Sequence, residues 1–531
     1  MSELTPVLLN AGEVLSSHAR LRPAASGARD LERTLTFRAW NERSCRLANA
    51  LLGLGLTRGD RVAVLAYNRL EWAEIYVAVA KAGLVAVPVN FRLTGPEVAF
   101  IVDDCAAAAL IVEDALTPTI EAVRTALPVP VDRFVHIGDA TPVGYRSYEE
   151  LLADAAVDEP GVIVVPDDAW CLMYTSGTTG NPKGAIRSHR GMAMVALVTG
   201  IEFRIHRGDT ALLVMPMCHA NSLNFFTSFL MCGAAITIFS RSTFDPELCL
   251  AALGSATFSS LVPTHYSMLS DVAESARPTT SSVEKLLVSS ATAFVETKRQ
   301  IMEMFPNAGL YELYGSTEAG WVTVLHPDEQ FEHLGTVGRE TVGSAPIRLL
   351  DDRGNEVPDG EPGELFSCSP QHFDGYWNLP DQTAEAMRGA YLSVGDIARR
   401  NDDGFIELID RKKNLIISGG ENVYPSEVEQ VLAAHPGVGD VAVFGVSDPK
   451  WSERVVAAVV PRAGASLTEE TLRDWTSGRL AGFKRPREFH FLDPGEMPRN
   501  ATGKILHRRL RDMFEVRDGH VDRPHTDEEP T

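Results

Sequence analysis

Apolar and polar positions alternate in two different periods along the first part of the chain, which predicts helices and strands in turn. One helical face is marked by Trp40, Ser44, Leu47, Ala48 and Leu51. The pattern then predicts strands at 61–66, 84–89 and 108–112, with helices at 70–81 and 95–104 between them, and further strands at 211–214 and 235–239. This order of elements indicates an α/β fold, in which mostly parallel β-sheets are covered by helices.

The pattern changes after residue 396. Short strands at 404–411, 413–420 and 438–446 surround a helix at 425–435, which indicates a small α+β module. The charge changes as well: the whole chain has 49 basic and 71 acidic residues, but residues 411–531 hold 18 basic and 19 acidic residues. We therefore predict a large N-terminal domain over residues 1–410 and a small C-terminal domain over residues 411–531.

The net charge of −22 argues against nucleic acid as the main partner, because phosphate binding needs a basic surface. The seven cysteines are scattered and odd in number, which indicates free thiols in a reducing compartment. The sequence begins without a basic, apolar leader, and the longest nearly apolar run, 225–239, is too short to cross a bilayer. We expect a cytoplasmic protein without a transmembrane segment. Whether it forms a homodimer is left open.

The strongest local motif is the run YTSGTTGNPKG at 174–184. Glycines let the backbone approach an anion closely, hydroxyls and amides donate to its oxygens, and Lys183 adds a positive charge. An apolar run precedes the motif, so we predict a phosphate-binding loop at the end of a strand. Its spacing differs from GxxxxGK[ST]. HExxH, GxSxG and GxGxxG are missing from the chain, which argues against metalloproteases, serine hydrolases and dinucleotide-dependent oxidoreductases.

Four further motifs follow in a fixed order. They are YELYGSTE at 311–318, YLSVGD at 391–396, DRKK at 410–413 with SGGENVYP at 418–425, and PRNATGK at 498–504. With the loop at 174–184 they resemble the motifs of the adenylate-forming (ANL) superfamily, in its acyl-CoA synthetase or fatty-acid–CoA ligase branch. This resemblance implies an acid–thiol ligase that uses ATP, Mg²⁺ and coenzyme A, and a mobile C-terminal domain.

The resemblance also implies how the nucleotide is bound. Glu318 would hold Mg²⁺, Tyr314 would stack on adenine with Glu312 at the edge of the ring, and Asp396 would accept from the ribose hydroxyls, assisted by Arg411. The phosphates would lie on Thr175, Ser176, Gly177, Thr178, Thr179, Gly180 and Lys183. The remaining wall of the AMP site would come from Ser290, Ala291, Leu313, Gly315, Ser316 and Thr317. Two positions depart from the family pattern: Val394 replaces the usual Thr, and Ala291-Thr292 replaces a Gly-rich pair.

The other implied roles concern catalysis and domain rotation. Lys504 would neutralise charge at the reacting carboxylate and α-phosphate, with Thr175 and Glu318 also in the catalytic set. His219 would gate the acyl pocket. Lys413 would be the hinge between the two half-reactions, and Gly419 and Gly420 would line the path of the coenzyme A thiol.

The substrate is less well defined than the chemistry. The segment 219–229 (HANSLNFFTSF) is largely apolar and has no arginine, which favours a monocarboxylic acid, with medium- or long-chain fatty acids ahead of aryl acids. An aryl-CoA ligase and a ligase that loads a carrier protein are alternatives, because these enzymes share the ATP motifs. A luciferase-like oxidative enzyme and a non-catalytic nucleotide-binding scaffold are more remote, and the intact Lys504, Glu318, Asp396 and Arg411 argue against the scaffold.

Overall fold

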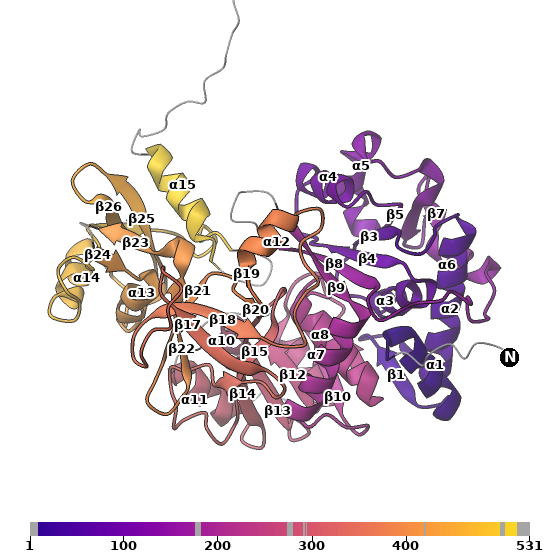
Figure 1. The fold of residues 1–531 in the computed structure, drawn as a ribbon, viewed down its shortest axis with the longest axis horizontal. Helices are drawn as coiled ribbons and strands as arrows, with labels where there is room; N and C mark the ends of the chain where they lie inside the picture. Colours follow the sequence, from indigo (N-terminus) through magenta and orange to yellow (C-terminus); the bar gives the residue numbers. More distant parts are fainter. Residues whose placement is uncertain are drawn as a thin grey trace, which may run out of the picture. The chain divides into compact units, whose positions relative to one another are not determined.

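The computed structural model describes residues 9–175, 182–272, 280–289, 293, 295–418, 421–462, 464–499 and 505–517 (Figure 1). The chain forms two compact units. The first consists of Met1–Arg348, Phe366–Val394 and Gly404–Ile406, and the second of Leu349–Leu365, Gly395–Asp403 and Glu407–Thr531.

The first unit contains a seven-stranded sheet. Its order is β7 (Arg146–Ser147), β6 (Phe134–Ile137), β5 (Ala109–Glu113), β3 (Arg61–Leu65), β4 (Val85–Val89), β8 (Ala169–Thr175) and β9 (Lys183–Ser188). All neighbouring strands are parallel except β8 and β9. The antiparallel β8–β9 pair places Thr175 opposite Lys183. Strand β8 therefore ends, and β9 begins, at the same edge of the sheet, on either side of the predicted phosphate loop.

A second sheet of the first unit has nine strands. Its order is β16 (Arg339–Glu340), β15 (Gly320–Leu325), β14 (Gly309–Ser316), β13 (Lys285–Ser289), β12 (Phe258–Leu261), β10 (Thr210–Leu213), β11 (Ala235–Ile238), β1 (Ser26–Arg29) and β2 (Thr34–Thr36). The strands from β14 to β1 are parallel, and antiparallel strands lie at both edges. The mostly parallel α/β architecture expected from the sequence is confirmed.

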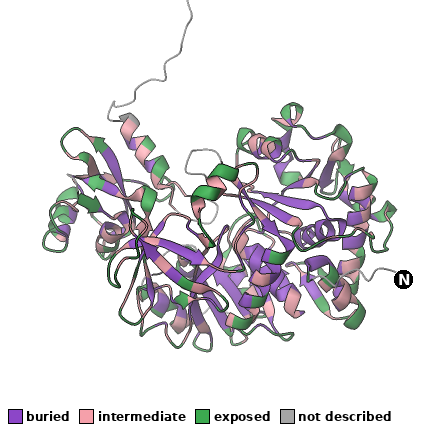
Figure 2. Ribbon diagram, in the orientation of Figure 1, coloured by how far each residue is buried: buried purple, intermediate pink, exposed green. Residues whose placement is uncertain are grey.

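Helices cover both faces of each sheet. The central strands carry apolar side chains on both faces, and both faces must therefore be shielded from water. On β3, Val62 and Val64 pack toward α2 (Phe37–Gly53), α3 (Glu71–Ala82) and α8 (Ala220–Cys232), in the core that the two sheets share. Ala63 and Leu65 pack toward α4 (Gly95–Asp104) on the opposite face. The outer face of the second sheet is covered by α9 (Pro246–Leu253), α10 (Pro263–Ser270) and α11 (Val295–Met304). Figure 2 shows these strands largely buried.

Local sequence signals set several of these boundaries. Helix α4 spans the residues expected for it, and the Thr94 and Glu97 side chains form a capping box at its N-terminus. Helix α8 ends at Gly233, whose φ of 67° is left-handed. The apolar run 225–239 is therefore the end of α8, a glycine turn and β11. Among the described residues no helix has the length and apolar character that a membrane span needs.

Five further α-helices and a short hairpin also belong to the first unit. They are α1 (Ala11–Leu21), α5 (Thr117–Glu121), α6 (Tyr148–Asp154), α7 (His189–Glu202), α12 (Pro380–Ala386), β19 (Met387–Arg388) and β20 (Tyr391–Leu392). Helix α7 packs lengthwise on α8.

The second unit is built on a long antiparallel pair, β25 (Val438–Asp448) and β26 (Ser452–Pro461). Strands β23 (Ile416–Ser418), β24 (Glu421–Val423) and β27 (Glu488–Phe491) extend this sheet. Helices α13 (Pro425–Ala433) and α14 (Glu469–Thr476) belong to one of its cores, and α15 (His507–Arg517) contributes Leu510 and Phe514 to the other. The α+β character expected after residue 396 is confirmed.

Candidate active site

Thr175 and Glu318 meet at the ends of two strands of the first unit. Thr175 is the last residue of β8, and Glu318 lies two residues after β14. The Thr175 hydroxyl donates to Glu318 Oε1 at 3.1 Å, and the Tyr376 hydroxyl donates to the same oxygen at 3.0 Å. Lys183 Nζ lies 5.1 Å from the centre of the Tyr376 ring. The structure thus brings Thr175 of one predicted motif onto Glu318 of another, 143 residues away in sequence, and adds Tyr376, which no motif predicted.

The predicted loop residues between these strands, Ser176, Gly177, Thr178, Thr179 and Gly180, lie outside the described residues. The described part fits the Mg²⁺ that the family implies. Glu318 is 7% exposed, and two hydroxyls hold its carboxylate in place. Mg²⁺ is commonly held by one or two carboxylates together with phosphate oxygens, so one fixed carboxylate beside a phosphate loop is a suitable donor set.

Arg187 on β9 is a residue that the sequence analysis missed. Its Nη1 donates to the carbonyl oxygens of Thr317, at 2.9 Å, and Glu318, at 3.4 Å. Arg187 is 2% exposed, and burial lowers the pKa of its guanidinium to about 10, against the opposing charges of Asp374 and Glu318. The sequence signal that could have indicated Arg187 is a charged residue within the buried strand KGAIRS. The sequence does not show its partners, because Thr317 and Glu318 lie 130 or more residues away along the chain.

Strand β14 carries the predicted adenine site. Glu312 and Tyr314 are two residues apart and so lie on one face of the strand, while Leu313 packs into the core on the other face. Gly315 is required sterically, since a Cβ there would lie 2.2 Å from the Gly320 carbonyl oxygen. The Ser316 hydroxyl accepts from the Ala319 amide and fixes the turn that leads to Thr317 and Glu318.

The other predicted wall begins where β13 ends. Ser289 is the last residue of β13 and lies opposite Leu313 of β14. Ser290 and Ala291 follow directly and lie outside the described residues. Their role therefore stays a prediction.

In the second unit, Asp396 and Arg411 form an ion pair. Asp396 begins β21 (Asp396–Arg400), Arg411 ends β22 (Ile406–Arg411), and Arg411 Nε lies 2.9 Å from Asp396 Oδ1. Asp396 is buried. Lys413 lies in the short turn Lys412–Asn414 that follows β22. Gly419, Gly420 and Lys504 lie outside the described residues, so the structure gives no position for them.

His219 lies directly before α8, and its Nε2 is buried without a hydrogen-bond partner among the described residues. Burial, together with the positive charge of Arg92, lowers the pKa of His219 to about 4. His265 on α10 also has its pKa lowered to about 4 by burial and by Arg92. The positive charge of Arg92, from the loop after β4, therefore affects a residue of the segment 219–229, although the segment itself contains no arginine.

The aromatic residues of this segment are not free to line an acyl pocket. Phe225, Phe226 and Phe229 are fully buried, and their rings pack on Phe258 and on Trp40 in the core. At the N-terminal end of α8 the Asn221 amide donates to Ser289 Oγ at 3.1 Å. The apolar residues on which the sequence-based preference for fatty acids depends therefore belong to the core, and the partly exposed residues are His219, Ala220 and Asn221.

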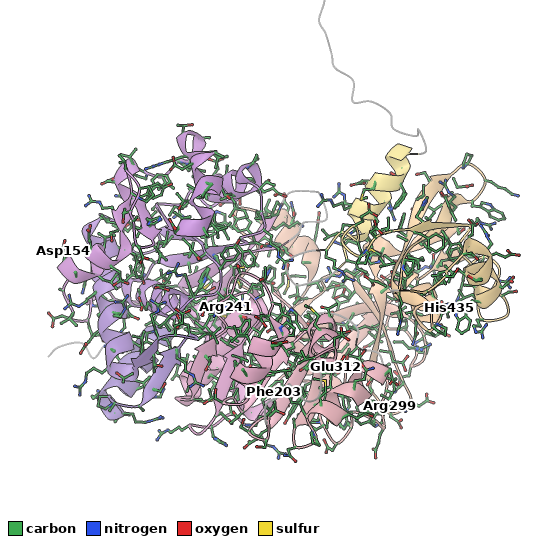
Figure 3. All side chains as sticks on the ribbon, turned by 180° about the vertical axis from the view of Figure 1, so that it is seen from behind. Asp154, Phe203, Arg241, Arg299, Glu312 and His435 are labelled. Atoms are coloured by element: carbon green, nitrogen blue, oxygen red, sulfur yellow. The ribbon has the colours of Figure 1, made fainter. Side chains whose placement is uncertain are left out.

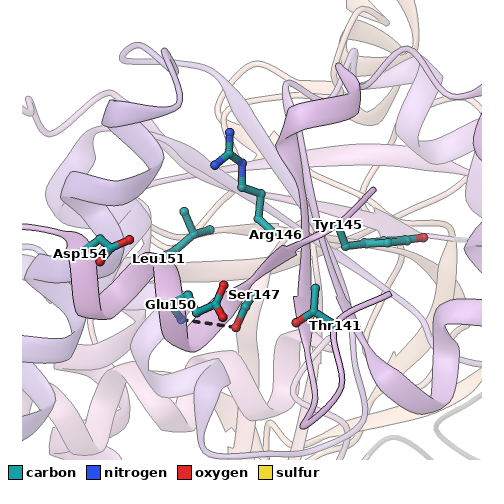
Figure 4. Close-up of a pocket in the computed structure, with 7 residues that line it drawn as sticks. All are labelled: Thr141, Tyr145, Arg146, Ser147, Glu150, Leu151 and Asp154. Carbon is teal, nitrogen blue, oxygen red and sulfur yellow. Dashed lines mark hydrogen bonds between the residues drawn. The ribbon is translucent and has the colours of Figure 1, made fainter. Parts of the chain in front are cut away.

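A surface hollow of about 310 Å³ lies between β7 and α6 (Figure 4). Its lining is mostly polar and includes Arg146, Glu150 and Asp154. None of its seven lining residues is a predicted site residue. The described residues contain no cluster of three or more His, Cys, Asp or Glu side chains that could bind a metal ion.

A mostly parallel α/β fold in which a threonine, a lysine and a buried glutamate lie at the ends of strands that flank a glycine-rich sequence is typical of nucleotide-binding enzymes. Residues 16–377 match the AMP-binding enzyme family, and residues 427–504 match the AMP-binding enzyme C-terminal domain. The chain belongs to this family, and its relatives include several CoA ligases.

The chain is similar to relatives and to solved structures over nearly its whole length. A feruloyl-CoA synthase from an Amycolatopsis species is 35% identical, over 93% of this chain and 97% of that protein. A fatty acid–[acyl-carrier-protein] ligase from Streptomyces coeruleorubidus is 32% identical, over 96% and 97%. The crystal structure of the anthranilate CoA ligase AuaEII in complex with anthranoyl-AMP has a TM-score of 0.88 at 26% identity, covering 98% of this chain and 99% of that chain.

Proposed function

We propose that the protein is an AMP-forming acid–CoA ligase. Its substrate is an aromatic carboxylic acid, or another carboxylic acid that carries polar groups. The adenylation part of the proposal depends on one observation: the Thr175 hydroxyl is bonded to the Glu318 carboxylate beside Lys183, at the rim of a glycine-rich loop. The acid attacks the α-phosphate of ATP, which gives an acyl-adenylate and pyrophosphate. The thiol of coenzyme A then attacks the acyl carbon and releases AMP.

The chain's own residues have separate tasks in the first half-reaction. Thr175 and Lys183, with the loop between them, bind the β- and γ-phosphates, and Glu318 holds Mg²⁺, which neutralises phosphate charge. Asp396 accepts from the ribose hydroxyls, and Arg411 keeps its carboxylate oriented. Lys504 places its ammonium on the reacting oxygens. Lys413 is the hinge between a nucleotide-binding domain, 1–410, and a C-terminal domain, 411–531.

The acyl group is inferred from the residues near the start of α8. A long alkyl chain gains little from the Asn221–Ser289 hydrogen bond or from the buried, unpartnered Nε2 of His219. A phenolic or amino substituent on an aromatic acid can use such groups. The feruloyl-CoA and anthranilate ligases among the similar proteins support an aromatic acid. A medium- or long-chain fatty acid is the second candidate, supported by the Streptomyces coeruleorubidus relative.

The test is a panel of acids, assayed with the full chain for acid-dependent release of pyrophosphate and for release of AMP with and without coenzyme A. Cinnamic and benzoic acids with hydroxyl or amino groups are compared with straight-chain acids of 6 to about 16 carbons. We expect the substituted aromatic acids to have the higher kcat/KM. A preference for straight chains would replace the aromatic proposal with the fatty-acid one, and no pyrophosphate release with any acid would contradict the ligase proposal.

The acceptor is tested in the same assay. We expect AMP release to depend on free coenzyme A. An enzyme that forms acyl-adenylate but transfers it only to a phosphopantetheine-bearing carrier protein would support the carrier-loading alternative instead.

A further inference from the structure

Lys298 and Glu312 form a buried ion pair behind the predicted adenine site. Lys298 lies on α11 and Glu312 on β14, and Lys298 Nζ is 2.5 Å from Glu312 Oε2. Lys298 is 1% exposed and Glu312 is 6% exposed. Figure 3 shows Glu312 inside the unit, whereas Arg299, the next residue after Lys298, lies at the rim. No motif of the sequence indicated this lysine.

The surroundings of Glu312 leave Lys298 as its only charged neighbour within the described part of the unit. Its partners in register are Val288 on β13 and Leu325 on β15, both apolar, and the backbone amide of Ala293 donates to its carboxylate. Burial raises the pKa of Glu312, and the charge of Lys298 opposes that rise. Without the ammonium, a carboxylate in this position would take up a proton at a much higher pH.

Such a pair is not explained by stability. Two apolar side chains of similar volume commonly stabilise a core as well as a buried ion pair does, since both charges must lose their water. Neither Lys298 Nζ nor Glu312 Oε2 makes a further hydrogen bond among the described residues. A buried carboxylate with unused hydrogen-bonding capacity is instead suited to a ligand that presents a donor.

The purine edge provides this donor. In adenine the exocyclic group at C6 is an amine, which donates to a carboxylate, whereas hypoxanthine and guanine carry an oxygen there, which a carboxylate repels. We propose that Lys298 is a positioning residue that keeps Glu312 ionised at the edge of the purine, so that the pair selects adenine over 6-oxopurines. The inference rests on the proposed function and on the prediction from the sequence that Glu312 lies at the edge of the adenine ring.

The test compares Mg·ATP with Mg·ITP, whose base is hypoxanthine. Binding of each nucleotide to the full chain is measured by calorimetry, and pyrophosphate release is measured between pH 6 and 8.5. We expect Lys298→Met to lower the preference for ATP over ITP by about tenfold to a hundredfold, the range of one hydrogen bond to a charged group. The loss should appear mainly as a higher KM for ATP.

The pH profile separates this role from a structural one. In Lys298→Met the unpaired Glu312 takes up a proton as the pH falls, so affinity for ATP should fall toward pH 6 and affinity for ITP should rise. Lys298→Arg keeps the charge and should keep both the preference and the flat profile. Arg299→Met, which removes the exposed cation next along α11, should match the wild type.

A second variant covers the case in which Lys298→Met does not fold. Lys298→Met combined with Glu312→Gln removes both charges, and an amide can donate as well as accept, so this variant should bind ATP and ITP about equally. An unchanged ATP preference in either folded variant, or equal binding of both nucleotides by the wild type, would overturn the inference. A wild type that prefers ATP but releases no pyrophosphate would contradict the proposed function and leave the adenine selection intact.

Discussion

The guanidinium of Arg187 donates to the carbonyl oxygen of Thr317 at 2.9 Å, and so ties strand β9 to the turn that carries Glu318. Since β9 begins at Lys183, one strand both delivers the lysine of the phosphate loop and fixes the carboxylate that would hold Mg²⁺. The turn that carries the Glu318 carboxylate is therefore held by a residue outside every motif.

Arg187→Met should weaken adenylation without unfolding the protein. The methionine fills much of the same volume but cannot hold the carbonyls of Thr317 and Glu318, so the Glu318 carboxylate loses its fixed position. We expect kcat/KM for Mg·ATP to fall about tenfold to a hundredfold, the range of one charged hydrogen bond. Arg190→Met removes an exposed arginine paired with Asp167 and should leave the rate unchanged. Equal rates for both variants would show that Arg187 does not position the site.

Asp396→Asn should impair recognition of the ribose. The amide keeps the size of the side chain but loses the charge that Arg411 faces at 2.9 Å. We expect a loss of about 1.5–3 kcal/mol in ATP binding, seen as a higher KM. The wild type should discriminate against 2′,3′-dideoxy-ATP and the variant much less. Undiminished discrimination in the folded variant would remove Asp396 from the site.

Lys504→Ala should abolish one half-reaction and spare the other. An ammonium on the reacting oxygens is worth about 10²–10³ in rate, so acid-dependent pyrophosphate release should fall by that factor. Conversion of supplied acyl-adenylate and coenzyme A to acyl-CoA should stay near the wild-type rate. A folded variant that loses both half-reactions equally would argue against rotation of the C-terminal domain.

Lys413→Pro should separate the half-reactions in a different way. Proline fixes φ near −65° and restricts a rotation about the Lys412–Asn414 turn. We expect one half-reaction to lose more activity than the other, as measured by pyrophosphate release and by thioester formation from supplied adenylate. Lys413→Ala keeps the backbone free and should retain both. Equal losses in Lys413→Pro, with unchanged circular dichroism, would place the hinge elsewhere.

His189→Phe should make the protein less sensitive to acid. His189 is 1% exposed, its ring stacks on Trp170, and burial lowers its pKa to about 4. The unfolded chain, with a pKa near 6.5, binds the proton that the folded state excludes, so the free energy of unfolding falls as the pH drops from 6.5 toward 4. Between pH 7 and pH 5 this histidine accounts for about 2 kcal/mol.

Urea unfolding at both pH values checks this expectation. The loss of unfolding free energy between pH 7 and pH 5 should be about 2 kcal/mol smaller in His189→Phe than in the wild type. The same loss in His189→Phe as in the wild type would show that His189 is protonated in the folded protein.

The sequence by itself determined the elements and the chemistry that depends on contiguous residues. The apolar patterns located the five strands and two helices predicted at 61–112, 211–214 and 235–239 to within a residue or two, as with 95–104 for α4, because burial of a local apolar face sets those boundaries. Glycine-rich and acidic motifs indicated the nucleotide site, because they place several functional groups within a few residues of one another.

Only the tertiary structure decided which distant residues serve that site and which belong to the core. Arg187 reaches Thr317 and Lys298 reaches Glu312 through contacts between neighbouring elements, and a single charged residue in a buried segment does not reveal its partner. Phe225, Phe226 and Phe229 look like an acyl-binding surface in the sequence but are fully buried against other aromatic rings. Apolar residues on every side of α8 have the same sequence signature whether they meet a ligand or a neighbouring sheet, because burial in either place removes the same surface from water.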